Sequence, residues 1–216
     1  PRLAQMYEYA ERAAALAARE DFDIIHAHDW WTYLAGIAIQ RRTGKPLVLH
    51  VHATCYNQAG GSNVDPVHLE VEKYAFAQAD SIVAISGQIR DLIIDLHGAD
   101  PAKIVVVHNG VNVAYYDRKA AVIEGLMELK ARGNKIVLFL GRMTIQKGPD
   151  YFIEAAKKTL EHYSDVYFVM NGVGDMREQV IQHAAHAGIA DRVIFTTGFG
   201  EMSIRLYQTA DPVSYT

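Results

Sequence analysis

The sequence predicts an α/β protein built from two Rossmann-like units, each with a parallel sheet. Short apolar runs alternate with helical segments along the 216 residues, which is the pattern of parallel strands joined through helices by right-handed crossovers. The alternation loosens over residues 113–133 and then restarts, so we expect a second unit to follow. The runs 104–107 and 136–140 are apolar without interruption, as strands buried inside a parallel sheet are.

In the first unit, residues 3–19 are rich in alanine and repeat apolar side chains with the period of a helix. Residues 23–31 contain a short strand that leads into a helix over 31–41. Ser86 is placed to cap the start of a helix and Gly98 to cap its end. The other elements expected in this unit are strands over 47–52, 79–86 and 104–107 and helices over 66–77 and 88–97.

The second unit follows a linker that holds one helix, over 121–131. Pro149 stands at the first position of a helix, where proline is tolerated best. The expected strands cover 135–140, 166–170 and 193–197, and the expected helices cover 149–163, 175–187 and 201–209. We therefore divide the chain into a first domain over 1–113, a linker or hinge over 114–134 and a second domain over 135–216.

Two cations follow the buried strand of the second domain. Arg142 comes directly after Gly141, and Lys147 lies just before the helix that Pro149 begins. The carboxyl ends of parallel strands are where such sheets bind ligands, and arginine and lysine both suit phosphate oxygens. The spacing alone fits a phosphate site and solvated loop cations equally well.

Glycines follow the next two strands. Gly172 and Gly174 come after the strand at 166–170, and Gly198 and Phe199 come after the strand at 193–197. Glycine lets a backbone approach a ligand closely, and the helix N-terminus that follows favours anions. Ordinary turns between strand and helix are the alternative interpretation.

Histidines gather at two strand ends of the first domain. His26 and His28 precede Asp29, and His50 and His52 end the next strand. Paired imidazoles suggest a metal-dependent hydrolase, but alternate residues of any strand share a face, and the further ligands of such a site have no obvious place. We therefore expect no metal ion.

Residues 141–148, Gly-Arg-Met-Thr-Ile-Gln-Lys-Gly, resemble the G-R-x-x-x-x-K-G signature of retaining GT-B glycosyltransferases of family 4, relatives of the glycogen and starch synthases. The V-H-A-T segment at 51–54 and the H-A-H-D-W segment at 26–30 are similar to segments of the same family. The resemblance runs from about residue 21 to 211. It implies the GT-B fold with both units incomplete, because the family's N-terminal glycine-rich loop and its paired-glutamate motif are missing.

The resemblance implies a role for each motif. Arg142 and Lys147 would bind and stabilise the departing diphosphate, and His52 would line the sugar site. His28, Asp29 and Trp30 would border the acceptor, with Trp30 as a platform for a sugar face and Trp31 mostly in the core. The implied donor-binding residues are Gly141, Gly172, Gly174, Gly198 and Phe199.

The resemblance implies that the parent enzyme is a retaining hexosyltransferase. It would move a sugar, most simply glucose from ADP-glucose or UDP-glucose, to a glucan or other carbohydrate acceptor without a cofactor. The fragment itself is expected to be inactive. A noncatalytic or defective nucleotide-binding fragment remains the main alternative, ahead of the metal-dependent hydrolase.

The composition of the chain limits the classes of partner and the compartment that we expect. The net charge of −4 and the absence of a Lys/Arg cluster argue against nucleic acid. The single cysteine, Cys55, fits a reducing compartment, so we expect a cytoplasmic protein. The sequence holds no apolar run of the ~20 residues that a membrane span needs, and it does not indicate the oligomeric state.

Overall fold

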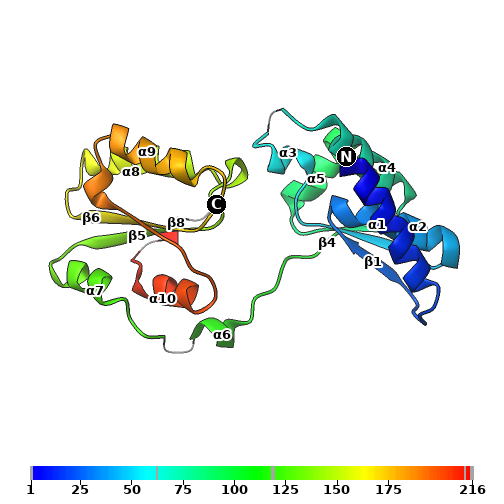
Figure 1. Cartoon of the computed structure of the whole chain (residues 1–216), viewed down its shortest axis with the longest axis horizontal. Coiled ribbons are helices and arrows are strands. Elements are labelled where there is room, and N and C mark those ends of the chain that lie inside the picture. The colour runs from blue at the N-terminus through cyan, green and yellow to red at the C-terminus, as the bar shows by residue number, and fades with distance from the viewer. Residues whose placement is uncertain (1, 62, 118–119, 212, 215–216) are drawn as a thin grey trace. The chain divides into compact units, whose positions relative to one another are not determined.

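The computed structural model describes residues 2–61, 63–117, 120–211 and 213–214. The chain divides into two compact units, Pro1–Val111 and Asn112–Thr216 (Figure 1). Each unit holds a four-stranded parallel sheet with helices, which confirms the predicted fold class. The ends of the predicted domains at residues 1, 215 and 216 lie outside the described residues.

The sheet of unit 1 has the strand order β1-β2-β3-β4. Helices α1, α2, α4 and α5 all contribute side chains to one core on a single face of this sheet. The caps agree with the sequence: the Ser86 side chain accepts from Ile89 N, and Gly98 ends α5 in the left-handed conformation. The elements are α1 (Arg2–Ala17), β1 (Ile25–His28), α2 (Trp30–Thr43), β2 (Leu47–Val51), α3 (Cys55–Gln58), α4 (Pro66–Gln78), β3 (Ser81–Ala84), α5 (Gly87–His97), a 3₁₀ turn (Pro101–Lys103) and β4 (Ile104–Val106).

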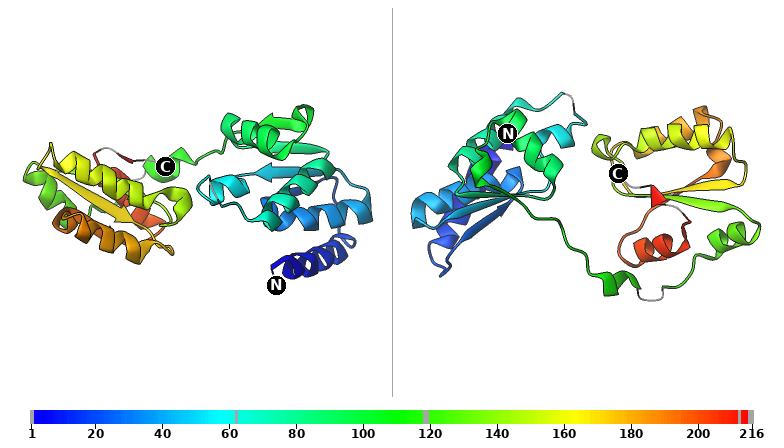
Figure 2. Two further views of the ribbon diagram at one scale, coloured as in Figure 1. Left: turned by 90° about the horizontal axis from the view of Figure 1, so that it is seen from above. Right: turned by 180° about the vertical axis from the view of Figure 1, so that it is seen from behind.

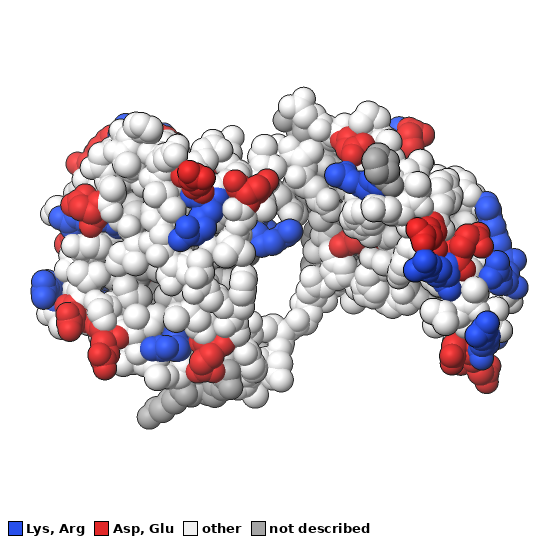
Figure 3. Space-filling model, in the orientation of Figure 1, with Lys and Arg blue, Asp and Glu red and all other residues white. Residues whose placement is uncertain are grey.

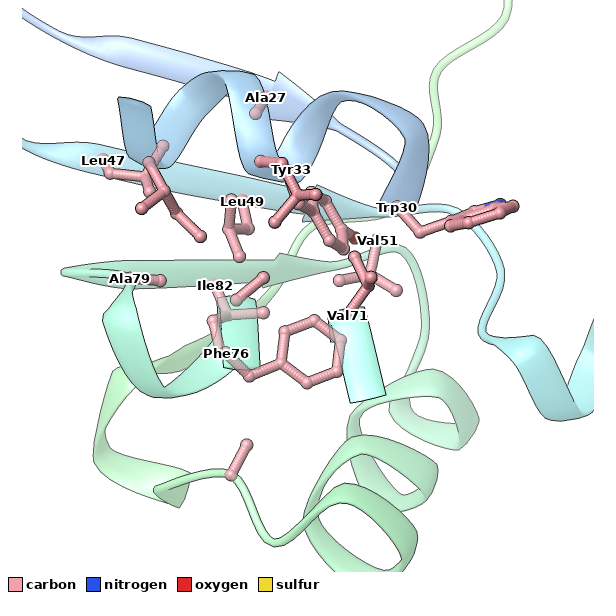
Figure 4. Close-up of a cluster of buried hydrophobic side chains, with 14 of the residues drawn as sticks. Ala27, Trp30, Tyr33, Leu47, Leu49, Val51, Val71, Phe76, Ala79 and Ile82 are labelled. Carbon is pink, nitrogen blue, oxygen red and sulfur yellow. The ribbon is translucent and has the colours of Figure 1, made fainter. Parts of the chain in front are cut away.

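The core of unit 1 follows the alternation of its strands. Every second strand residue points into the helices, so Leu47, Leu49 and Ile82 are fully buried (Figure 4). The residues between them point to the other face, where the side chains of His26, His28 and Val105 are exposed. One face of this parallel sheet is therefore accessible among the described residues, although parallel sheets are usually covered on both faces.

The sheet of unit 2 has the order β7-β6-β5-β8 and carries helices on both faces (Figure 2). Helices α8 and α9 pack with Phe139 on one side, and α7 and α10 pack with Ile136 and Leu138 on the other. The prediction that the strand at 136–140 is buried on both faces is confirmed. The elements are α6 (Val113–Asp117), α7 (Glu124–Ala131), β5 (Lys135–Leu140), a 3₁₀ turn (Ile145–Lys147), α8 (Pro149–Leu160), β6 (Val166–Asn171), α9 (Arg177–His186), a 3₁₀ turn (Ala190–Arg192), β7 (Val193–Thr196), α10 (Glu201–Thr209) and β8 (Val213–Ser214).

The helix of the predicted linker packs inside unit 2. Leu126 of α7 is 5% exposed and contacts the same core as Ile136 and Leu206. The Lys130 side chain also donates to the carbonyl of Thr209 and pairs with Asp211. The structure therefore places the described residues of 114–134 in the second unit, because the apolar face of α7 is needed to cover its sheet.

Candidate functional site

Three loops leave the same edge of the unit 2 sheet. The strands are in register at their carboxyl ends, with Leu140 beside Asn171 and Asn171 beside Thr196. Each loop therefore starts at the edge where parallel α/β sheets bind ligands. This arrangement gathers the predicted donor-binding residues Gly141, Arg142, Lys147, Gly172, Gly174, Gly198 and Phe199 at one edge of one sheet.

The first two loops are joined by their backbones. Met143 donates its N–H to the carbonyl of Val173 at 2.9 Å, and Met176 donates to the carbonyl of Met143 at 3.0 Å. A Cβ atom on Gly172 would lie 1.9 Å from the carbonyl oxygen of Gly141. A Cβ atom on Gly174, whose φ is +159°, would lie 2.2 Å from the carbonyl oxygen of Met143. Both glycines thus permit a contact between loops, which is a structural role that the sequence did not reveal.

The two predicted phosphate-binding cations lie on the first of these loops. Arg142 is exposed and Lys147 is half-buried in the turn before α8. Neither side chain has a hydrogen-bond or ion-pair partner among the described residues. Both are close in sequence to the N-terminus of the twelve-residue helix α8, whose unpaired N–H groups add to a positive potential. The loop therefore offers cations that no carboxylate of the described chain neutralises.

Asn171 holds the third loop and was missed by the sequence analysis. It is 1% exposed, and its Nδ2 donates to the carbonyl of Gly198 at 2.9 Å. Its Oδ1 is buried without a partner among the described residues. The signal in the sequence was a single amide at the end of an otherwise apolar strand. Phe199 next to Gly198 is 68% exposed.

In unit 1, Asp29 connects the ends of β1 and β2. Its carboxylate accepts from the backbone N–H of His52 at 2.8 Å and of Ala53 at 3.4 Å, and its own N–H donates to the carbonyl of His50 at 3.0 Å. Its φ of 58° is rare outside glycine. Whether Asp29 also binds substrate stays a prediction. Its carboxylate positions His52, which lies beside His28 with Nε2 3.0 Å from Nδ1 of that residue.

The two tryptophans are reversed relative to the prediction. Trp30 is 4% exposed and its ring stacks on that of His68 at 3.9 Å between centroids, whereas Trp31 is 46% exposed. Helix α2 begins at Trp30, so the helical period places Trp30, Tyr33 and Ile37 on the buried side and Trp31 on the outer side. The buried Trp30 ring is therefore corrected to a core residue and offers no open face to a sugar.

A buried carboxylate supports the segment after His52, and the sequence analysis missed it. Glu72 on α4 is fully buried; both oxygens accept from the N–H of Cys55 at 3.1 Å, and Oε2 lies 2.7 Å from Nε2 of His97. Nε2 of His68 lies 3.1 Å from Oε1. Burial raises the pKa of such a carboxyl, but the contacts with His68, His97 and Cys55 outweigh it and lower the Glu72 pKa to about 2.

Position on the helix could have revealed Glu72. The buried residues of α4 are spaced as one helical face, and Glu72 lies on that face with Val71 and Ala75. Burial, together with the neighbouring Glu72 carboxylate, raises the pKa of the Cys55 thiol, so Cys55 is a protonated core residue. The pKa values of His26 and His50 are lowered, mainly by burial and then by neighbouring histidines.

Unit 1 has one recess beside the candidate site and a larger one away from it. A recess of about 210 Å³ along β1 is lined in part by His26 and His28. A larger one of about 430 Å³, between α1 and α4, is lined mostly by apolar side chains and by none of the predicted site residues. We therefore do not include the larger recess in the candidate site.

Charges on the visible face are mixed. Lys/Arg and Asp/Glu side chains alternate over both units without a broad patch of one sign (Figure 3). This agrees with the small net charge of −4. Among the described residues, no helix combines the length and apolarity required to cross a membrane.

Comparison with known proteins gives consistent matches. The family model described as Glycosyltransferase Family 4 matches residues 1–115, and the one described as Glycosyl transferases group 1 matches residues 127–215. An uncharacterised glycosyltransferase of Methanocaldococcus jannaschii is 28% identical over 96% of this chain and 55% of its own length. A D-inositol 3-phosphate glycosyltransferase of Nocardia farcinica is 34% identical over 89% of this chain and 46% of its own length.

The fold also matches a solved structure. The crystal structure of Anabaena HepE in complex with UDP and glucose superimposes with a TM-score of 0.75 at 19% identity, covering 96% of this chain and 55% of that protein. The chain therefore spans about half the length of the relatives it matches.

Proposed function

This chain belongs to glycosyltransferase family 4, and from this premise we propose that the protein transfers a sugar from a nucleotide diphosphate sugar to a hydroxyl acceptor. Its two parallel-sheet units are those of the GT-B fold. The observation that carries the proposal is the pair Arg142 and Lys147, which are unpartnered among the described residues at the carboxyl edge of the unit 2 sheet.

The proposed chemistry needs those cations. The bond between the sugar C1 and the diphosphate oxygen breaks, and its electron pair leaves with the phosphate. The acceptor oxygen forms the new bond to C1 and gives its proton to the departing diphosphate oxygen. Negative charge therefore grows on the departing diphosphate, and Arg142 and Lys147 would stabilise it; losing one such group typically lowers the rate about 10²–10³-fold.

In unit 1, His52 is proposed to line the sugar site. Asp29 fixes the backbone at His52 through the 2.8 Å hydrogen bond, and His28 contacts its ring. A neutral imidazole can orient a sugar hydroxyl or accept its proton. His28 would border the acceptor, while Asp29 acts as a positioning residue.

The finer assignments are also proposals. Retention of the anomeric configuration and glucose as the sugar come from the resemblance of the 141–148 segment, and the UDP and glucose in the HepE complex support a UDP-linked glucose as donor. A glucan is the acceptor that the resemblance favours. The names of the inositol-phosphate relatives favour a second candidate, a small phosphorylated polyol.

Calorimetric titration tests donor binding directly. ADP, UDP and their glucose conjugates would be titrated into the chain and into an Arg142→Ala/Lys147→Ala variant. Each hydrogen bond to a charged group is worth about 1.5–3 kcal/mol, so the variant should lose about a hundredfold or more in affinity. A Lys157→Ala/Lys158→Ala variant removes the same charge from the last turn of α8 and should bind as the wild type does.

Comparison of the adenine and uracil nucleotides in this titration identifies the base of the donor, because the nucleotide that the donor contains should bind more tightly. Equal binding by wild type and the Arg142/Lys147 variant would reject the assignment of the diphosphate site. Equal loss in both double variants would show that net charge, and not this loop, holds the nucleotide.

A further inference from the structure

Three histidines of unit 1 share the accessible face of its sheet. His26 and His28 are alternate residues of β1 and therefore point to the same face. His50 lies on the neighbouring strand, where the register places it directly beside His28. The sequence suggested a metal only through the two H-x-H pairs, and it did not show which of these histidines would meet on one ion. The strand register adds a third histidine, from the second pair.

The ligand atoms are close enough to bind one ion. One ligand nitrogen from each of His26, His28 and His50 lies within 4.8 Å of the other two. Nδ1 of His50 is 3.2 Å from Nε2 of His26. Two imidazole nitrogens on a tetrahedral zinc ion are about 3.3 Å apart, given Zn–N distances of about 2.0–2.1 Å. One pair is thus already at the required separation, and the ligand nitrogen of the exposed His28 would have to move closer to the ion.

Besides one another, the rings contact His52, whose Nε2 lies 3.0 Å from Nδ1 of His28. Nε2 of His50 is buried and has no hydrogen-bond partner among the described residues. Oδ1 of the nearby Asp29 carboxylate accepts from the N–H groups of His52 and Ala53. Three imidazoles therefore face one another on a part of the sheet that no described helix covers.

We propose that His26, His28 and His50 form a site for one divalent transition-metal ion such as Zn²⁺, with its fourth position open to solvent. Imidazole suits zinc and its neighbours in the first transition row, and three imidazoles with an open position are a known arrangement for zinc. The site does not depend on the proposed sugar transfer, because it needs neither the loops of unit 2 nor a nucleotide.

Metal titration of the tag-free chain tests the site. Zn²⁺ would be followed by calorimetry and Co²⁺ by its visible absorption, which strengthens in tetrahedral coordination. We expect one ion per chain. His26→Gln and His50→Gln should each weaken binding at least tenfold, since even the loss of an outer-shell partner of a ligand costs about 10–100-fold. His186→Gln, which changes an exposed histidine of α9, is the matched control and should bind like wild type.

Circular dichroism of each variant confirms that the fold is intact, which is expected because the His26 side chain is exposed. Absence of binding, or binding that His26→Gln and His50→Gln leave unchanged, would overturn the proposal. A thiolate-to-cobalt absorption band would also overturn it, because it would place the ion at the buried Cys55, Glu72 and His97 instead. Since no nucleotide is present, none of these outcomes bears on the diphosphate site.

Discussion

Asp29 shows how one strained residue organises the edge of unit 1. Its φ of 58° and ψ of 164° lie in a region that glycine adopts readily and other residues rarely do. Its carboxylate accepts hydrogen bonds from the backbone N–H groups of His52 and Ala53. Without Asp29, these two N–H groups would lose that acceptor. Strain of this kind persists where surrounding contacts determine it, and it is often found at functional sites.

We expect Asp29→Ala to lower the free energy of unfolding by about 1–3 kcal/mol, because the N–H groups lose their acceptor and alanine tolerates the positive φ poorly. Asp29→Asn keeps an oxygen acceptor and should lose clearly less. Urea denaturation of the three proteins measures the difference. Identical midpoints for Asp29→Ala and wild type would show that the turn does not need this carboxylate.

Glu72 and His97 form a buried pair in the core of unit 1. Nδ1 of His97 lies 3.3 Å from the carbonyl oxygen of Leu92, and Nε2 lies 2.7 Å from Glu72 Oε2. The buried Glu72 carboxylate is therefore held by His97 together with the N–H of Cys55. Replacing the carboxylate would leave these buried groups without their charged partner.

Glu72→Gln should therefore destabilise unit 1 by about 3–5 kcal/mol. The folded-state pKa of Glu72, about 2, lies below the ordinary value of 4.5, so this stabilisation is present above about pH 4.5 and is lost as the pH falls toward 2. Chemical denaturation between pH 7 and pH 2.5 should show a steeper loss for wild type than for the variant. Glu70→Gln changes a carboxylate of the same helix outside its buried face and should keep the wild-type profile. Parallel profiles for wild type and Glu72→Gln would contradict the assigned pKa.

At the scale of elements, replacing glycine by alanine should have opposite effects on stability in a loop and in a helix. The carbonyl of Gly141 on the adjacent loop leaves no room for a Cβ atom on Gly172. A Cβ atom on Gly125 in α7, by contrast, would meet nothing within 4 Å. Gly172→Ala must separate the two loops that Met143 and Val173 join, so it should lose about 1–3 kcal/mol of stability and weaken nucleotide binding. Gly125→Ala should gain about 0.5–1 kcal/mol, since alanine favours a helix. Thermal denaturation distinguishes the two, and a neutral Gly172→Ala would show that the loops move apart freely.

The order of strands and helices was predictable because parallel strands are short apolar runs and the helices keep a 3.6-residue period. The strand 136–140 and the caps at Ser86 and Gly98 follow from local chemistry. The burial of Trp30 and the placement of α7 were not predictable, because each depends on where a helix begins or what its sheet needs covered. The role of Gly172 depends on the carbonyl of Gly141, a contact between loops that no local pattern encodes.

For the whole molecule, charge gives a test of the donor site. A net charge of −4 provides no general attraction for an anionic nucleotide, so binding must come from a local pair of cations. Raising the salt from ~0.1 M to ~1 M shortens the screening length from about 10 Å to about 3 Å. Nucleotide affinity of the wild type should then fall several-fold, while residual binding by the Arg142→Ala/Lys147→Ala variant should change little. Titrations at both salt concentrations measure this, and a wild-type affinity independent of salt would argue against phosphate recognition by these cations.

Strand β1 has a further consequence for handling the protein. It is the first strand of its sheet and pairs only with β2 among the described residues, so half of its backbone N–H and C=O groups lack a strand partner. Such an edge strand can form backbone hydrogen bonds with a strand of another molecule, and this pairing becomes more frequent as the protein concentration rises. The exposed Ile24 just before the strand makes that pairing more favourable. Concentrated stocks should therefore form oligomers through strand addition, and Ile24→Lys should suppress these oligomers as measured by light scattering.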